Sequence, residues 1–267
     1  MPPTLCGVLG HPVGHSRSPA IHEAAYAELG LDWRYVKLPV PPELFEETVR
    51  ALPGSGYRGA NVTIPHKLAA LRVADSASPA ARAVGAANTL TFADGAIEAE
   101  NTDAGGLLDA IDRPVAGLRA VVLGAGGAGR AAAWALCEAG AAAVAVWNRT
   151  PARAAALARE LDVDLAERPR ADCDRLVNAT SVGLDPGTAD DAALGELGLA
   201  GIDPPALVVD LVYRSGGRTP VQSWAERGGA GFVDGLEVLV RQGARSFELW
   251  TGRPAPLAPM RAAAHAV

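Results

Sequence analysis

The sequence is poor in cysteine and has no long uninterrupted hydrophobic run. Three cysteines occur in 267 residues, at positions 6, 137 and 173, and no two of them form a Cys-x-x-Cys pair. Such spacing favours reduced thiols over a disulfide framework or a zinc site. The most apolar region, 131–147, is interrupted by Glu138 and Gly140 and is too short to cross a membrane. The first ten residues do not have the pattern of a signal peptide, so we expect a cytoplasmic protein.

An excess of positive charge is also missing. The chain has 24 Lys and Arg against 30 Asp and Glu, a net charge of −6, which argues against a non-specific nucleic-acid surface. A small anionic ligand remains possible, because a local cluster of donors can bind one. The histidines lack the spacing of metal ligands and have no cysteine or carboxylate partners, so we expect no metal site. Hydrophobic residues make up 49% of the chain, as in a globular protein of one or two domains.

The first hundred residues alternate between strand and helix patterns. We predict strands at 5–9, 33–40 and 58–64, each followed by a helix, at 19–29, 42–52 and 65–73. This alternation indicates a parallel sheet covered by helices. Asp94-Gly95 between two short apolar runs predicts an antiparallel hairpin at the edge of that sheet, with strands at 88–92 and 97–101. Ser18 is predicted as a helix N-cap, and Pro65 as a first helical residue.

A second α/β pattern follows. Strands are predicted at 119–123, 142–147, 176–178, 207–211 and 232–233, with helices at 105–111, 151–161, 220–227 and 236–250, and a long loop over 183–205. Another helix follows the glycine run after residue 123 and ends near Ala139. The last predicted helix, 236–250, has an apolar stripe at helical spacing, but periodicity does not indicate what this stripe packs against.

The glycine run has a recognisable pattern. Gly124-Ala125-Gly126-Gly127-Ala128-Gly129 follows a predicted strand and opens a predicted helix, which is the context expected of a dinucleotide-binding loop. Its glycines allow backbone N–H groups to approach a pyrophosphate at the helix N-terminus. The alternative is an ordinary glycine-rich turn in a chain that is rich in glycine and alanine.

The residues after the next strand indicate which dinucleotide is bound. Asn148-Arg149-Thr150 follow Trp147, where an NAD-type site has an acidic residue to hold the ribose 2′-hydroxyl. No acid is present, and Arg149 offers a planar cation that suits a 2′-phosphate. We therefore predict NADP rather than NAD, unless Arg149 is merely a solvent-exposed residue at the end of a strand.

Lys67 is the most informative residue of the first half. It falls in the first turn of a predicted helix, where the positive end of the helix dipole disfavours an ammonium by up to about 1 kcal/mol. A solvated surface lysine is one explanation, and a functional cation is the other. Asp103 has a similar ambiguity, because it can be an N-cap or a carboxylate that faces a ligand site. Ser16 and Ser18 flank a helix N-terminus and can cap it or bind a carboxylate.

Polar residues also gather at predicted strand ends in both halves of the chain. Asn88, Asn101 and Asn178 lie there, as does the Thr180-Ser181 pair. In parallel α/β sheets, ligand sites lie outside the carboxyl ends of the strands. The shared position of these residues therefore indicates binding sites.

Taken together, these motifs resemble the shikimate dehydrogenase family. The motifs cover residues 5–252 in the order typical of the family: 15–19, 61–67, 85–89, 101–103, 124–129, 148–150, 178–183, 210–213 and 235–242. The resemblance implies two α/β domains, namely 1–103 plus 237–267 for substrate binding and catalysis, and 104–236 as a Rossmann-type NADP-binding domain. C-terminal helices then return to the first domain.

The resemblance also implies reversible, NADPH-dependent reduction of 3-dehydroshikimate to shikimate, in aromatic amino-acid (chorismate) biosynthesis. It implies a catalytic pair, Lys67 and Asp103, which also contact the substrate. The implied substrate-binding residues are Ser16, Ser18, Asn61, Thr63, Asn88, Tyr213 and Gln242. The implied cofactor-binding residues are Gly124, Ala125, Gly126, Gly127, Ala128, Gly129, Asn148, Arg149, Thr150, Thr180, Val212 and Gly235.

Three alternatives remain open at this stage. Quinate and aminoshikimate dehydrogenases share the scaffold, although the Ser18 and Thr63 hydroxyls suit shikimate. A non-catalytic NADP-binding regulatory protein is a different class of function, which the presence of both Lys67 and Asp103 disfavours. The sequence is compatible with a monomer or a homodimer.

Overall fold

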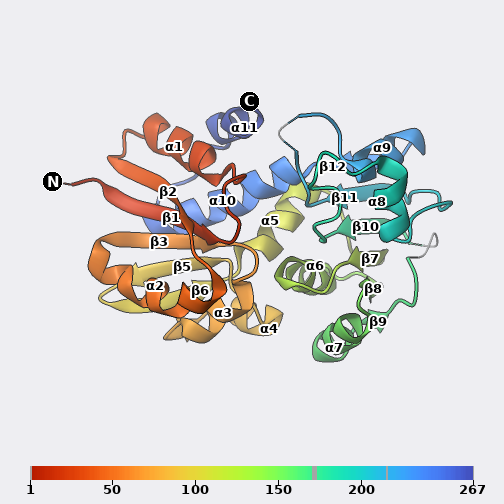
Figure 1. The fold of residues 1–267 in the computed structure, drawn as a ribbon, viewed down its shortest axis with the longest axis horizontal. Helices are drawn as coiled ribbons and strands as arrows, with labels where there is room; N and C mark the ends of the chain where they lie inside the picture. The colour runs from red at the N-terminus through yellow and green to blue at the C-terminus, as the bar shows by residue number, and fades with distance from the viewer. Residues whose placement is uncertain (1, 170–172, 215, 267) are drawn as a thin grey trace. The chain divides into compact units, whose positions relative to one another are not determined.

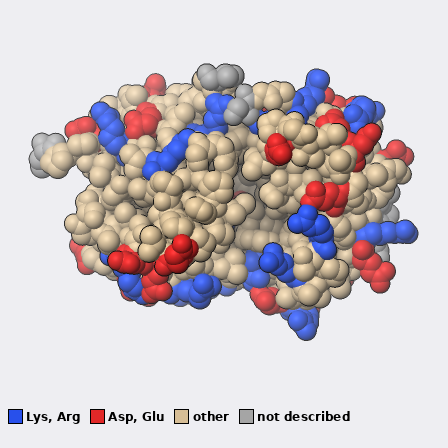
Figure 2. All heavy atoms as spheres, in the orientation of Figure 1, with Lys and Arg blue, Asp and Glu red and all other residues tan. Residues whose placement is uncertain are grey.

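The computed structural model describes residues 2–169, 173–214 and 216–266. The chain divides into two compact units, one formed by Met1–Gly106 with Leu239–Ala266 and the other by Leu107–Val238. Each unit contains a six-stranded sheet with helices packed on it (Figure 1). Among the described residues, no helix is long and apolar enough to cross a membrane. Lys and Arg side chains are interspersed with Asp and Glu on the face drawn in Figure 2.

The sheet of the first unit is mixed, with the order β2-β1-β3-β5-β6-β4. Strands β1, β2 and β3 are parallel, whereas β5 is antiparallel to both β3 and β6. The hairpin turn has Asp94 at φ 52° and Gly95 at φ 80°, the left-handed conformations that suit a tight hairpin connection. The predicted hairpin is therefore confirmed. The strands span Thr4–Gly10 (β1), Trp33–Pro39 (β2), Tyr57–Val62 (β3), Ser76–Ala77 (β4), Thr89–Ala93 (β5) and Ala96–Glu100 (β6).

Helices α2 (Phe45–Ala51) and α3 (Lys67–Val73) bury apolar side chains against this sheet. Phe45 of α2 and Val73 of α3 belong to one cluster with Leu9, Val62 and Leu90 from the strands. The N-terminal part of this unit also contains α1 (Ser18–Glu28), α4 (Pro79–Val84) and the 3-10 turns η1 (Pro42–Leu44) and η2 (Pro53–Ser55).

The first unit is completed by chain that follows the second. Most of α10 (Gly235–Thr251) belongs to the first unit, and α11 (Leu257–His265) packs against α1. The Trp250 indole of α10 donates a hydrogen bond to the Leu90 carbonyl at 3.1 Å. This contact confirms the implied return of the C-terminal helices and identifies the partner of the apolar stripe.

The sheet of the second unit is entirely parallel, with the order β12-β11-β10-β7-β8-β9. Two sets of strands extend outward from β7 and β10, which is the order of a dinucleotide-binding Rossmann fold. This agrees with the prediction. The strands span Arg119–Leu123 (β7), Ala143–Trp147 (β8), Asp164–Leu165 (β9), Arg175–Asn178 (β10), Leu207–Asp210 (β11) and Gly231–Val233 (β12).

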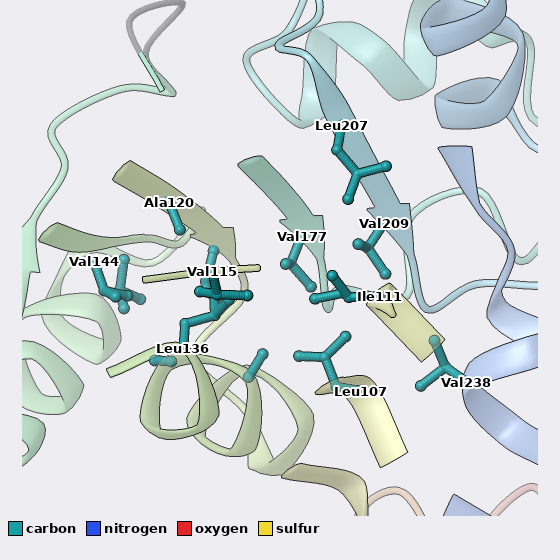
Figure 3. Packing of buried hydrophobic residues seen from close by; sticks show 14 of the residues in the cluster. Leu107, Ile111, Val115, Ala120, Leu136, Val144, Val177, Leu207, Val209 and Val238 are labelled. Carbon is teal, nitrogen blue, oxygen red and sulfur yellow. The ribbon is translucent and has the colours of Figure 1, made fainter. Parts of the chain in front are cut away.

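Helices of the second unit bury their apolar faces on this sheet. Figure 3 shows Leu107 and Ile111 of α5 (Thr102–Ile111) pointing towards Val177 of β10 and Val209 of β11. Leu136 of α6 lies in the same cluster. The other helices of this unit are α6 (Gly127–Glu138), α7 (Pro151–Leu161), α8 (Asp190–Glu196) and α9 (Pro220–Arg227).

Several local predictions require correction. Helix α3 begins at Lys67, so Pro65 precedes the helix instead of opening it. Ser18 is the first residue of α1, and the N-cap position belongs to Arg17, which makes no side-chain capping bond. The predicted loop 183–205 contains helix α8, which is too short to produce a clear periodic pattern. The two-residue strands β4 and β9 were also missed.

The packing of α10 depends on one glycine. A Cβ atom at Gly59 of β3 would lie 2.1 Å from Trp250 Nε1, well inside van der Waals contact. The indole therefore occupies the space that any side chain at residue 59 would need.

We predict that Gly59→Ala lowers the stability of the protein by about 1–3 kcal/mol, because either Trp250 or β3 must move. The corresponding fall in Tm is about 2–10 °C, measured by thermal denaturation. Gly54→Ala is a matched control, since no atom lies within 4 Å of the added Cβ. Equal Tm values for the two variants would contradict this account of the packing.

Candidate functional site

One edge of the first sheet gathers most of the predicted polar residues. Strands β1 and β3 are parallel and end at this edge, and the register pairs Asn61 of β3 with Thr89 of β5. Because β5 runs in the opposite direction, it begins where β3 ends, and β6 ends there again. One edge of the sheet therefore brings together the segments that follow β1, β3 and β6. The residue that precedes β5 lies at the same edge.

Lys67 and Asp103 form an ion pair at this edge. Lys67 Nζ lies 2.6 Å from Asp103 Oδ2, and their side chains are 14% and 18% exposed. Lys67 is the first residue of α3, and Asp103 lies in the first turn of α5. The dipole of α3 disfavours the cation, whereas the dipole of α5 favours the carboxylate, so the carboxylate offsets the unfavourable position of the lysine.

The alternative role of Asp103 as an N-cap does not apply. Asn101 Oδ1 accepts the hydrogen bond from the Ala104 backbone N–H at 3.1 Å, which is the capping contact of α5. Asn101 Nδ2 also donates to the Ala86 carbonyl at 2.9 Å. Asn101 therefore fixes the start of α5, and the Asp103 carboxylate is left to pair with Lys67.

Two amide side chains surround this pair. Asn88 Nδ2 lies 3.0 Å from Asp103 Oδ1 and 3.1 Å from Gln242 Oε1. The Asn88 backbone carbonyl accepts a 2.7 Å hydrogen bond from Val62 N, which holds the residue beside β3. Gln242 comes from α10, where its Nε2 donates to the Leu239 carbonyl at 2.8 Å. Both residues are buried.

Hydroxyl groups lie in the loops at the ends of β1 and β3. Ser16 Oγ accepts a 3.3 Å hydrogen bond from Ser18 N at the start of α1, and the Ser18 side chain is buried. Thr63 follows β3, and its N–H donates to the Leu9 carbonyl at 2.9 Å. The His11 N–H donates to the Ile64 carbonyl at 2.9 Å, which joins the two loops.

Asn61 is placed differently from the other predicted residues. It is buried within β3, and protein groups contact both its amide oxygen and its amide nitrogen. Its hydroxyl partners include Tyr35 and Thr89, which sequence reasoning did not select. Thr89 falls in the 85–89 motif, whereas no signal in the sequence separates Tyr35 from ordinary strand residues.

This arrangement suits chemistry at a carbonyl or hydroxyl group. A partly buried ammonium can stabilise negative charge that develops on a substrate oxygen, and a paired carboxylate fixes its position. Amide and hydroxyl groups around the pair can bind a polar substrate. Among residues 2–169, 173–214 and 216–266, no group of three or more His, Cys, Asp or Glu side chains is placed to hold a metal ion.

In the second unit, the three glycines of the motif have distinct surroundings. A Cβ at Gly124, where φ is 111°, would lie 2.8 Å from the Ala179 carbonyl oxygen. At Gly129 it would lie 2.0 Å from the Gly124 carbonyl oxygen, whereas at Gly126, the N-cap residue of α6, no atom lies within 4 Å. Gly124 and Gly129 thus allow close packing, and Gly126 leaves open space at the helix N-terminus, as a bound pyrophosphate requires.

The residues after β8 are positioned beside this loop. Asn148 Oδ1 accepts a 3.2 Å hydrogen bond from Ala125 N, and Asn148 Nδ2 donates to the Thr150 carbonyl at 3.1 Å. Arg149 forms an ion pair with Glu196 of α8. Both side chains are solvent-exposed, so the pair is weak and an anionic ligand can compete for the guanidinium. Glu196 lies far away in the sequence and was not predicted.

A buried polar network lies at the ends of β10 and β11. Thr180 Oγ1 donates to Asn178 Oδ1 at 2.7 Å, and Asn178 Nδ2 donates to Asp210 Oδ1 at 2.8 Å. Asp210 also accepts hydrogen bonds from Thr219 Oγ1 at 2.6 Å and Val212 N at 3.1 Å. Burial raises the pKa of the Asp210 carboxyl from 3.8 to about 6, and these hydrogen bonds oppose the rise.

The remaining predicted residues belong to this second unit. A Cβ at Gly235 would lie 2.8 Å from the carbonyl oxygens of Asp210 and Val212, which explains the glycine at this position. Tyr213 is the one predicted substrate-binding residue that belongs to the second unit. The first unit contains all the others.

Three family models match successive parts of the chain. Residues 8–90 match the shikimate dehydrogenase substrate binding domain, 108–184 the shikimate / quinate 5-dehydrogenase family, and 235–265 the shikimate 5'-dehydrogenase C-terminal domain. A shikimate dehydrogenase (NADP(+)) of Methanothermobacter thermautotrophicus is 41% identical over 95% of this chain and 93% of its own length. The chain belongs to the shikimate dehydrogenase family.

Solved structures of family relatives agree with the fold. The chain is 40% identical to shikimate 5-dehydrogenase of Thermus thermophilus, solved in complex with NADP(H) and shikimate, with a TM-score of 0.85 and 98% of each chain covered. It is also similar to 5-ketofructose reductase of Gluconobacter sp. strain CHM43, at 30% identity and a TM-score of 0.82, with 98% of each chain covered. The same fold therefore occurs with different named substrates.

The raised pKa of Asp210 predicts a pH-dependent contribution to stability. Between pH 3.8 and about 6, the folded protein keeps a proton that the unfolded protein releases, so this contribution falls as the pH rises through that range. The free energy of unfolding of the wild type, minus that of Asp210→Asn, should therefore fall by up to about 3 kcal/mol between pH 4 and pH 7. Urea denaturation at several pH values measures this difference, and a constant difference would contradict the prediction.

Proposed function

We propose that the chain is an NADP-dependent shikimate dehydrogenase, which interconverts 3-dehydroshikimate and shikimate in chorismate biosynthesis. The observation that carries the proposal is the Lys67–Asp103 pair, 2.6 Å apart and surrounded by amides and hydroxyls, in a member of the shikimate dehydrogenase family. None of its three cysteines, all within the described residues, forms a disulfide, which favours a cytoplasmic enzyme.

Lys67 and Asp103 have different roles in this proposal. NADP(H) supplies or accepts the hydride. During reduction of the ketone, negative charge develops on the carbonyl oxygen, and the Lys67 ammonium stabilises it and supplies the proton. In the oxidation direction, Lys67 removes the hydroxyl proton. Asp103 holds the lysine Nζ in position.

The surrounding residues suit the polar groups of shikimate. Ser16 and Ser18, at the start of α1, are proposed to bind the substrate carboxylate near backbone N–H groups. Each ring hydroxyl needs a partner in a desolvated site, because an unpaired polar group there is costly. Asn61, Thr63, Asn88 and Gln242 are proposed to provide these partners, and Tyr213 is proposed to bind the carboxylate with the two serines.

The second unit is proposed to bind NADP(H). The open N-terminus of α6 at Gly126 suits the pyrophosphate, and Gly124, Ala125, Gly127, Ala128 and Gly129 complete its loop. Arg149 suits the 2′-phosphate, with Asn148 and Thr150 beside it. Thr180, Val212 and Gly235 follow the adjoining strands of the same sheet edge. We assign residues 104–236 to cofactor binding, and residues 1–103 with 237–267 to substrate binding and catalysis.

The reaction is tested by following absorbance at the nicotinamide band. We expect turnover of shikimate with NADP+, and slower or no turnover with NAD+. Quinate and aminoshikimate are the alternative substrates within the family, and 5-ketofructose with NADPH tests the chemistry named for the Gluconobacter relative. Faster turnover of any of these would overturn the substrate assignment. A protein that binds NADPH and turns over none of them would be a regulatory binder instead.

We predict that Lys67→Ala lowers kcat for shikimate by about 10²–10⁴-fold, because the general acid–base group is lost. The KM for shikimate should change much less. Arg72→Ala is a matched control, since it removes an exposed cation from the same helix. Steady-state kinetics distinguish the outcomes, and a Lys67→Ala effect confined to KM would contradict the role of Lys67.

We also predict that Glu196→Gln lowers the KM for NADP+ by about 2–5-fold, the size expected for an exposed ion pair. The 2′-phosphate no longer has to displace a carboxylate from Arg149. The KM for NAD+, which lacks this phosphate, should not change. Glu226→Gln is the control, because Glu226 forms an exposed ion pair with Arg218 and not with Arg149. Equal effects on NADP+ and NAD+ would show that Glu196 does not compete with the phosphate.

A further inference from the structure

The hydrogen-bonding capacity of Asn61 is used within the protein. Its Oδ1 accepts from Tyr35 Oη at 2.7 Å and lies 3.4 Å from Ser246 Oγ. Its Nδ2 lies 3.0 Å from Thr89 Oγ1 and 3.3 Å from the Asn88 carbonyl oxygen. A primary amide has two N–H donors and two acceptor lone pairs, so these contacts engage both its N–H groups and its oxygen. Asn61 is only 4% exposed.

These contacts continue to the catalytic pair. Thr89 Oγ1 lies 3.0 Å from Thr102 Oγ1, and the Thr102 N–H donates to Asn88 Oδ1 at 2.7 Å. Asn88 Nδ2 then lies 3.0 Å from Asp103 Oδ1. A continuous hydrogen-bonded network therefore joins Asn61, inside the sheet, to the carboxylate that holds Lys67.

The Tyr35 hydroxyl holds the oxygen of the Asn61 amide. The tyrosine hydroxyl donates to Oδ1 at 2.7 Å, whereas the single proton of Ser246 is closer to the Gly243 carbonyl, at 3.0 Å. In the opposite orientation, Asn61 Oδ1 would face the Asn88 carbonyl oxygen without a donor between them. The Asn88 carbonyl therefore fixes the orientation in which Nδ2 points to Asn88 and Thr89, and the Tyr35 hydroxyl holds Oδ1 in that orientation.

The Tyr35 ring is itself held firmly. It is 4% exposed and stacks on His22, with ring centroids 4.3 Å apart and planes 9° apart. Trp250 belongs to the same aromatic cluster, and its ring centroid lies 6.3 Å from that of Tyr35. Burial raises the pKa of Tyr35 well above its usual value and lowers that of His22 to about 3, so both rings are uncharged at neutral pH. A neutral tyrosine remains a hydrogen-bond donor.

We propose that Tyr35 and Asn61 are positioning residues for the dehydrogenase reaction: Tyr35 holds the Asn61 amide, which in turn holds Asn88 and Thr89 beside Asp103. This inference rests on the proposed function. It adds to the substrate-binding role that the resemblance implies for Asn61. It also adds Tyr35, a residue of β2, to the groups that determine the rate.

The test is Tyr35→Phe, which removes only the hydroxyl. We expect kcat/KM for shikimate to fall about tenfold, because small displacements of catalytic groups are costly. The KM for NADP+ should not change. Tyr26→Phe is the matched control: Tyr26 is buried in the same aromatic cluster, but its hydroxyl lies beside Cys6 and outside the network. Equal kcat/KM values for the two variants would overturn the inference, even if both lower Tm.

A double-mutant cycle separates positioning through Asn61 from a direct effect of Tyr35. In an Asn61→Ala background, Tyr35→Phe should cause no further loss of kcat/KM, because the amide that Tyr35 holds is gone. Additive losses would overturn the inference. If Asn61→Ala does not fold, the comparison of Tyr35→Phe with Tyr26→Phe still decides. Absence of wild-type turnover would instead refute the proposed function.

Discussion

The ion pair between Lys67 and Asp103 is the interaction on which the first unit is organised. Each residue lies in the first turn of a helix, and the dipole is unfavourable for the lysine and favourable for the aspartate. Partial burial removes some of the water that would otherwise solvate both charges. Buried ion pairs add little stability on balance, so folding stability alone does not explain this one.

The surrounding structure limits where these two charges can go. Asn101 fixes the first turn of α5, and the backbone of Ala87 donates to the Lys67 carbonyl at 2.9 Å. Asn88 links the carboxylate to Gln242 of α10. The antiparallel β5 is essential to this geometry, because it begins at the edge where β3 ends. A fully parallel sheet would place Asn88 at the opposite edge.

Most of the fold could be predicted from sequence, because its signals are local. Strand and helix alternation, Asp94-Gly95 and the glycine run each determine nearby backbone geometry, and the Rossmann order follows from them together with the resemblance. Helix boundaries were less predictable: the loop before Lys67 ends two residues later than Pro65 suggested. Helix α8 has only seven residues, too few for a periodic signal.

The candidate site was predictable only in part, for a related reason. Lys67 stands out because a cation is unfavourable in the first turn of a helix. Asp103 stands out because an acidic residue is favourable there and can also face a ligand. Tyr35 and Glu196 do not stand out, because a tyrosine in a strand and a glutamate on a helix are ordinary. Their roles depend on partners far away in the sequence, such as Asn61 and Arg149. Only the three-dimensional structure brings these partners together.

The discontinuity of the first unit has a consequence for biosynthesis. The chain leaves this unit at Gly106 and returns at Leu239, so the second unit is synthesised in between. Until α10 emerges from the ribosome, Gly59 lacks the indole that packs on it, and Asn88 lacks its Gln242 partner. Nascent chains fold as units, N-terminal first. Here, however, the residues around Lys67 and Asp103 can be completed only after the Rossmann unit has been made.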